Sequence, residues 1–344
     1  MSARSSTPTD PGVAIRAEGV SKTFGGAVRA LDGVNLSLPA GELVALIGGN
    51  GAGKSTLLKI LFGSTGHDAG SVRVLGLDPR RDRSSLRARI GYAGQDVALD
   101  PEISGWETLA LFYALRALPH QDRRERLQWL AEEYDLLEFC DRPVGGYSGG
   151  QRQRLHLAIE TMHEPSLLLL DEPTASLDPG GRRALWERLA AWRDRGHTVL
   201  VTTHDLEDIA AHCDRVLLLE RGRLIAEGHP AALIAEHGRA RTVITLERPP
   251  GPDAGGLREA LGALEGAPEV AIEGRTVTLW RDRHPGHGEP ALDLLTARGI
   301  PYYRYERWEP DLANAYFRLT GSPWGSGPDR GGAGRGRGRG RNNR

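Results

Sequence analysis

The 344-residue sequence has few cysteines and few lysines, and it contains no long apolar run. Cys140 and Cys213 lie far apart and outside any metal-ligand spacing, which excludes a disulfide-stapled fold and predicts two thiols that are buried or incidental. No apolar run reaches the ~18–20 residues that a membrane-spanning helix needs. The polar first dozen residues lack the apolar core of a secretory signal, so we expect a cytoplasmic protein.

What is present is ordinary for a globular protein, with 39% hydrophobic residues, 26% charged residues and a formal net charge of −1. This composition predicts one large or two medium folded domains. Residues 1–12, rich in Ser, Thr and Pro, and residues 322–344, rich in Arg and Gly, are predicted to be disordered because they offer little apolar surface to bury. The Arg-Gly tail resembles tails that bind RNA, and a solvated tail without a dedicated function is the alternative.

Four short and nearly continuous apolar runs indicate buried strands of a mostly parallel sheet. They are Leu43–Ile47, Leu167–Leu170, Thr198–Thr202 and Arg215–Glu220. Between them, Trp106–Ala117 and Arg123–Tyr134 have helical spacing and predict a helical insertion over about residues 96–162. The alternation of strands and helices predicts an α/β core that extends from residue 13 to about residue 235.

A different order of elements follows residue 235. The pattern predicts a strand, a helix, two strands, a helix and a strand, which is the order of a ferredoxin-like fold. A last helix is expected over Asp311–Leu319, with its apolar side packed on this small domain. We therefore predict a small α+β domain over residues 236–321.

A glycine-rich loop, GGNGAGKST at residues 48–56, follows one predicted strand and opens a helix. Gly48, Gly51 and Gly53 allow the backbone N–H groups to turn toward phosphate oxygens, and the helix N-terminus adds positive potential. Lys54 is placed to reach the β- and γ-phosphates, and Ser55 to ligate Mg²⁺. Only two other lysines occur in the chain, which makes Lys54 conspicuous.

Two further motifs complete a nucleotide site. SLLLLDEP, at residues 166–173, is a buried strand that ends in two carboxylates, and we assign Asp171 to Mg²⁺ and Glu172 to the attacking water as its base. YSGGQRQR, at residues 147–154, places Ser148 before a helix, where the free N–H groups of the first turn attract anions. One chain thus has two helix N-termini that are suited to bind phosphate.

These motifs, with Gln95, the Ser176–Asp178 triplet and His204 in this order, resemble the nucleotide-binding subunit of ATP-binding-cassette (ABC) transporters over about residues 13–235. The resemblance implies a P-loop ATPase fold with ATP and Mg²⁺ as cofactors. It also implies a head-to-tail homodimer, in which each ATP lies between the phosphate loop of one subunit and the Ser148–Gln151 signature of the other. A separate membrane permease would be driven by this dimer.

The resemblance also implies individual roles. Phe24 would stack on adenine, Gln95 would link magnesium and the attacking water to the helical insertion, His204 would contact the γ-phosphate, and Asp178 would cross to the opposite subunit. The local alternatives are a core phenylalanine, an exposed glutamine, a packing histidine and an Asp-Pro turn. The residues expected to contact nucleotide or metal are Phe24, Gly48, Gly49, Asn50, Gly51, Ala52, Gly53, Lys54, Ser55, Thr56, Gln95, Ser148, Gly149, Gly150, Gln151, Asp171 and Asp178, with Lys54, Gln95, Glu172 and His204 as the catalytic set.

Departures from the family pattern are small. Tyr147 stands where leucine is usual, Gly49 where proline is common, and Ala93-Gly94 where Leu-Pro is frequent. The ending EPDLANAYFRLTG, at residues 309–321, is similar to the ending EPsLEdvFlrLTG of drug-efflux ATPases of the daunorubicin-exporter type. In the family, residues 96–117 would be where the permease docks.

The sequence therefore predicts a transport-coupled ATPase, peripheral on the inner face of the cell membrane, that exports drug-like or lipid-like compounds with a separate permease. The alternative is a soluble ABC ATPase that acts on the ribosome or on nucleic acid through the Arg-Gly tail. A single cassette per chain argues against that alternative, because translation factors of this family usually fuse two.

Overall fold

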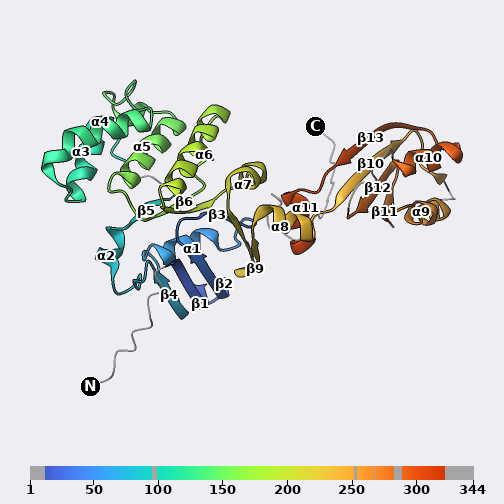
Figure 1. Cartoon of the computed structure of the whole chain (residues 1–344), viewed down its shortest axis with the longest axis horizontal. Coiled ribbons are helices and arrows are strands. Elements are labelled where there is room, and N and C mark those ends of the chain that lie inside the picture. Colours follow the sequence, from blue (N-terminus) through green and yellow to red (C-terminus); the bar gives the residue numbers. More distant parts are fainter. Residues whose placement is uncertain (1–11, 95–98, 252–253, 267, 283–288, 322–344) are drawn as a thin grey trace, which may run out of the picture.

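A computed structural model describes residues 12–94, 99–251, 254–266, 268–282 and 289–321. The predicted leader, the Arg-Gly tail and Gln95 lie outside these described residues, apart from Gly12. In Figure 1, the chain up to about residue 230 forms one body, and the sheet of the C-terminal region stands beside it, past α8 and α11.

A six-stranded sheet forms the centre of the larger body, in the order β5-β6-β7-β3-β8-β9. Its strands are β5 (Ile90–Ala93), β6 (Leu167–Asp171), β7 (Thr198–Thr202), β3 (Leu43–Ile47), β8 (Arg215–Glu220) and β9 (Arg223–Gly228). All neighbours are parallel except β8 and β9. Every residue of β3, β6 and β7 is buried, which explains why these strands are continuous apolar runs in the sequence.

Alternate residues of β3 face two different cores. Leu43, Ala45 and Ile47 pack with the helices of the predicted insertion and with α6, whereas Val44 and Leu46 pack with the first helix and a second sheet. Figure 1 shows these helices and the second sheet on opposite sides of the central sheet. The second sheet has the order β2-β1-β4 and consists of β1 (Val13–Phe24), β2 (Val28–Pro39) and β4 (Ala69–Val74).

The helical insertion is present where the periodicity predicts it. Its helices are α3 (Gly105–Leu115), α4 (Arg123–Glu133) and α5 (Gly149–Thr161), with the short turns η1 (His120–Asp122) and η2 (Val144–Gly146). The other helices of the larger body are α1 (Lys54–Leu61), α2 (Arg83–Arg87), α6 (Pro179–Asp194), α7 (Leu206–His212) and α8 (Pro230–His237). Both cysteines are free and buried, which is the first of the two predicted alternatives.

The C-terminal region contains a four-stranded antiparallel sheet in the order β11-β12-β10-β13. Its elements are β10 (Ala240–Leu246), α9 (Ala254–Gly262), β11 (Glu269–Glu273), β12 (Thr276–Arg281), α10 (Pro290–Ala297) and β13 (Tyr302–Trp308). Its separate core is built from β10, β12, α9 and α10. No helix among the described residues is long and apolar enough to cross a membrane.

The last helix, α11 (Leu312–Thr320), does not pack where we expected it. Leu312 and Tyr316 belong to the core of the larger body, and α11 lies against α8 and α7. The expectation that this helix packs on its own small domain is therefore wrong. Its apolar face was identified correctly, but the periodicity of a helix does not name the surface that covers that face.

Candidate functional site

The glycine-rich loop lies between β3 and α1, at the carboxyl end of the central sheet. A Cβ atom added to Gly48 would lie 2.1 Å from the Leu219 carbonyl oxygen, and one added to Gly53 would lie 2.4 Å from the Ala30 carbonyl oxygen. Gly51 and Gly53 have φ values of 79° and 109°, in the left-handed region. These close approaches and dihedral angles explain why glycine occupies the three positions.

Lys54, the first residue of α1, turns back over the loop. Its Nζ donates to the carbonyl oxygen of Gly48 at 2.8 Å and to that of Gly49 at 3.3 Å. Burial lowers the pKa of Lys54, and the charges of Glu172 and Asp171 oppose that shift. The structure therefore brings the lysine of one motif within electrostatic range of both carboxylates of another.

Asp171 ends β6 and is only 4% exposed. It lies in register with Thr202 at the end of β7, and the Thr202 hydroxyl donates to its Oδ1 at 2.8 Å. The same hydroxyl accepts the backbone N–H of Glu172 at 2.8 Å. Thr202 was not among the predicted site residues, although its place at the end of a neighbouring parallel strand puts it at the same sheet edge.

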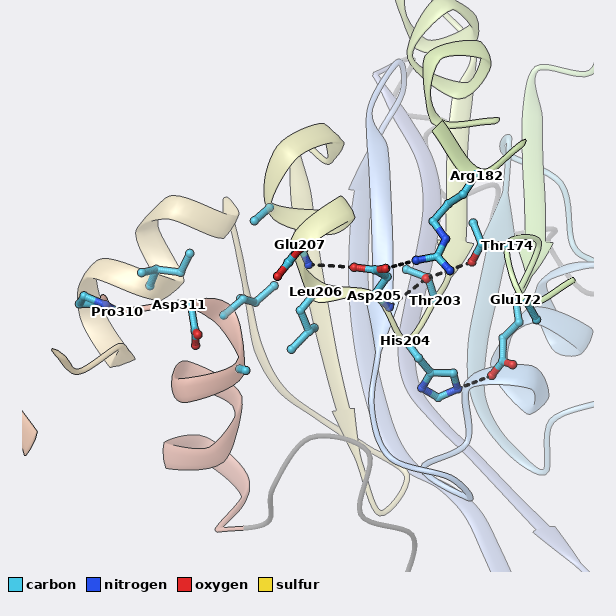
Figure 2. Close-up of a pocket in the computed structure, with 15 residues that line it drawn as sticks. Glu172, Thr174, Arg182, Thr203, His204, Asp205, Leu206, Glu207, Pro310 and Asp311 are labelled. Atoms are coloured by element: carbon cyan, nitrogen blue, oxygen red, sulfur yellow. Dashed lines mark hydrogen bonds and ion pairs between the residues drawn. The ribbon is translucent and has the colours of Figure 1, made fainter. Parts of the chain in front are cut away.

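Glu172 follows with φ of 53°, which is rare for a residue with a side chain. This turn points the carboxylate away from the strand and toward His204, whose Nε2 lies 2.6 Å from Glu172 Oε1 (Figure 2). The side chains of His204 and Glu172 are 42% and 21% exposed, so both remain accessible. The predicted base and the predicted γ-phosphate sensor are thus in direct contact.

Ser148 begins α5 with a capping box. Its hydroxyl accepts the N–H of Gln151 at 3.2 Å, and the Gln151 side chain accepts the N–H of Ser148 at 2.9 Å. A cavity of about 510 Å³ joins this signature to the Ser176–Asp178 loop, and its lining contains no residue of the phosphate loop. Within the described part of one chain, the two predicted phosphate sites therefore lie in different places.

The remaining predicted residues divide into three cases. Asp178 caps α6, accepting the N–H of Gly181 at 3.1 Å, which is the local role of an Asp-Pro turn. Phe24 ends β1 and is 45% exposed, so it is not a core residue. Gln95 lies outside the described residues.

A cavity of about 830 Å³ adjoins the Glu172–His204 pair (Figure 2). Glu172, His204 and the Arg182–Asp205 ion pair line one side, and Pro310, Asp311 and Leu312 at the start of α11 line the other. The C-terminal helix thus borders the predicted catalytic region. This proximity could not be predicted from the sequence, because the two segments are more than a hundred residues apart.

Comparisons with known proteins define the class that this site represents. A family model described as ABC transporter matches residues 31–175. The chain is similar to several ATP-binding cassettes of known structure. One titled as the ATP-binding subunit of an ABC transporter has a TM-score of 0.60 at 28% identity and covers 65% of this chain and 92% of that one. A dimeric post-hydrolysis state of the cassette MJ0796, bound to ADP and Pi, has a TM-score of 0.58 at 27% identity and covers 62% and 98%.

Curated relatives extend the similarity over nearly the whole chain. The Nod factor export ATP-binding protein I of Burkholderia orbicola (strain AU 1054) is 38% identical over 306 residues, 88% of this chain and 95% of that protein. The daunorubicin resistance ATP-binding protein DrrA2 of Streptomyces coeruleorubidus is 37% identical over 312 residues, 90% and 96% of the two chains. The chain belongs to the ATP-binding subunits of ABC transporters. It is an ATPase, and ATP and Mg²⁺ are its cofactors.

Proposed function

We propose that this chain is the motor of a two-component exporter of drug-like or lipid-like compounds and works with a separately encoded permease. The observation that carries the proposal is the Glu172–His204 pair beside the Lys54 loop, in a chain whose relatives are named for Nod factor export and daunorubicin resistance. These relatives favour transport over the alternative of a soluble ATPase that acts on the ribosome or on nucleic acid. Binding of nucleic acid by the tail is supported by composition alone.

The geometry of the site supports a hydrolytic role for each of these residues. Glu172 accepts a proton from a water molecule. The oxygen of that water attacks the γ-phosphorus, and the bond between the γ-phosphorus and the β–γ bridging oxygen breaks. Lys54 and His204 stabilise the charge that develops on the γ-phosphate oxygens. Asp171, a buried carboxylate at the sheet edge, and the Ser55 hydroxyl are oxygen ligands of the kind that Mg²⁺ prefers. Mg²⁺ held by these residues would neutralise negative charge on the phosphates.

We further propose that two copies of the chain share each ATP. Among the described residues, the cavity at the Ser148–Gln151 signature has no lining residue from the phosphate loop, which supports a second copy that brings the two motifs to one nucleotide. The free N–H groups at the start of α5 and the adjacent Asp178 loop would then face the partner. The dimer of the cassette MJ0796 is a precedent within the same fold.

The helical insertion offers a surface for the permease. On α3, Leu111 and Leu115 lie four residues apart, on one face of the helix, and are 46% and 70% exposed. Such an apolar pair is suited to a docked helix of a membrane partner, which would hold the chain at the inner face of the membrane. Trp106 and Phe112 are partly buried against the core and would hold α3 in place when the partner binds.

The C-terminal sheet supports a ferredoxin-like accessory domain within residues 236–321. Its strands have the order second, third, first, fourth, with antiparallel neighbours and two helices over one core. We infer that the ATP-binding domain spans residues 13–235.

The proposal is tested by purifying tagged protein from gently solubilised native membranes and identifying what accompanies it by mass spectrometry. We expect a multi-spanning membrane protein at near-equal stoichiometry. Leu115→Arg should lose this partner while the purified protein retains its ATPase activity. Recovery of ribosomes or RNA in place of a membrane protein would contradict the exporter and favour the soluble ATPase.

A further inference from the structure

The C-terminal helix α11 reaches the phosphate loop through one side chain. Tyr316 is 3% exposed and belongs to the core of the ATP-binding domain. Its hydroxyl lies 3.5 Å from Glu220 Oε2, at the end of β8. The same oxygen lies 3.6 Å from the position that a Cβ atom on Gly49 would occupy. A residue near the end of the described chain thus contacts the loop expected to bind phosphate.

The neighbouring parts of the loop are fixed by the ATP-binding domain itself. Gly48 lies directly over the carbonyl group of Leu219. The N–H of Gly222, in the turn after β8, donates to the Ala52 carbonyl oxygen at 2.9 Å. Between these two fixed points lies Gly49, whose carbonyl oxygen accepts from Lys54. Tyr316 therefore contacts the loop at a point between its two backbone attachments.

The chemistry of a buried phenol suits this position. A neutral hydroxyl donates one hydrogen bond, for which Glu220 is the acceptor, and accepts others. Burial raises the pKa of Tyr316, and the Glu220 charge adds to this shift, whereas hydrogen bonds with Thr320 and with the Gly49 backbone act in the opposite direction. Tyr316 thus stays protonated at neutral pH and bridges the carboxylate and the loop.

A hydrogen bond to the loop matters more with glycine at position 49 than it would with proline. Proline, common at this position of the phosphate loop, has a fixed φ and no backbone N–H. Glycine has the largest backbone freedom to lose on ordering and retains an N–H that requires a partner. The hydroxyl is available because position 316 is tyrosine, whereas the drug-efflux ending similar to this chain has phenylalanine there.

We propose that Tyr316 is a positioning residue for nucleotide binding, because its hydroxyl holds the phosphate loop at Gly49 in the conformation that accepts phosphate. A loop ordered beforehand loses less entropy when ATP binds. A change in the position of α11 would therefore change the affinity of the protein for ATP. This inference rests on the proposed role of the phosphate loop in nucleotide binding.

The test compares full-length Tyr316→Phe with wild type and with Tyr113→Phe as the matched control. Tyr113 is also 3% exposed, and its hydroxyl donates to the Pro119 carbonyl oxygen at 2.8 Å in the helical insertion, so both variants lose one buried hydroxyl. We expect Tyr316→Phe to raise the Kd and the KM for ATP by about two- to tenfold, the range for one hydrogen bond. Its kcat should stay within about twofold, because Glu172 and His204 are untouched. Tyr113→Phe should leave the Kd unchanged.

Hydrogen exchange of the nucleotide-free proteins locates the effect. Peptides that cover residues 46–58 should exchange faster in Tyr316→Phe than in wild type, with no such change in Tyr113→Phe. An unchanged Kd in Tyr316→Phe, or an equal rise of the Kd in both variants, would overturn the proposal. Lys54→Ala separates the two levels of inference: if it binds ATP like wild type, the role of the loop itself is wrong, whereas a lost affinity together with an unchanged Tyr316→Phe refutes only the role of Tyr316.

Discussion

Nε2 of His204 lies 2.6 Å from Oε1 of Glu172, although the two residues follow the ends of different strands. The contact depends on the parallel pairing of β6 with β7, which brings both carboxyl ends to one sheet edge. It also depends on the left-handed backbone of Glu172, which is held by hydrogen bonds from its N–H to the carbonyl and hydroxyl oxygens of Thr202. The contact between Glu172 and His204 therefore depends on the register of the sheet.

His204→Ala should lower kcat by about 100-fold while ATP still binds. The variant removes a donor to the γ-phosphate and the group that orients the Glu172 carboxylate. Steady-state phosphate release and fluorescent-nucleotide titration measure the two effects separately. His120→Ala, a change of an exposed histidine in the helical insertion, should match wild type in both. Equal turnover of His204→Ala and wild type would exclude His204 from the reaction.

Thr202→Val should reduce both stability and activity. It removes the hydroxyl that donates to Asp171 and accepts from Glu172, at a cost of about 1–3 kcal/mol in the free energy of unfolding. We expect kcat to fall about tenfold or more, because two residues of the site lose their positions. Thr198→Val on the same strand removes a hydroxyl that accepts the Gly41 N–H and should cost stability without lowering kcat. A similar kcat in both variants would contradict the role of Thr202.

Gly48→Ala should abolish nucleotide binding. The added Cβ atom would lie 2.1 Å from the Leu219 carbonyl oxygen, so the loop must move away from the end of β8. An affinity loss of at least about 100-fold is expected, because the backbone N–H groups no longer converge on phosphate. Gly255→Ala, in α9, meets no atom within 4 Å and should leave the affinity as it is. Tight ATP binding by Gly48→Ala would show that the loop does not hold phosphate.

The protein should lose stability in mild acid through a buried histidine in α5. Burial lowers the pKa of His156 to about 4, with Arg116 adding to the shift and Glu160 3.9 Å away. The unfolded chain, with a histidine pKa near ~6.5, binds more protons between pH 6.5 and pH 4, so the free energy of unfolding falls as the pH drops through that window.

The loss due to His156 should approach about 3 kcal/mol at pH 4, and His163, whose pKa is also lowered to about 4 by burial, acts in the same direction. His156→Gln should flatten the pH dependence measured by urea unfolding, although it does not abolish it. A profile as steep as that of wild type would show that His156 is not buried in its neutral form.

The buried strands could be predicted almost to the residue. Leu43–Ile47 and Thr198–Thr202 have the predicted bounds, because a strand covered on both faces must be apolar throughout. The strand β2, with its alternating burial, was not anticipated, since exposed residues alternate with buried ones along it and weaken the apolar signal. The motif residues could be named as candidates from the sequence because the chemistry of phosphate binding restricts which residue types can serve.

What could not be predicted depends on pairing between distant segments. Thr202 was missed because its function lies in its register with Asp171, and the sequence of one strand does not specify its neighbour. Tyr316 lies within the helix predicted over Asp311–Leu319, but its contacts with Glu220 and Gly49 exist because α11 packs on the larger body.

Glu172→Gln tests the central claim most directly. Light scattering with Mg²⁺ and ATP, together with phosphate release, reports dimer formation and turnover on the same sample. The amide keeps the shape of the side chain and cannot accept a proton from water, so ATP should be bound, the protein should become dimeric, and turnover should fall at least about 100-fold. Steady-state hydrolysis at the wild-type rate would contradict the account.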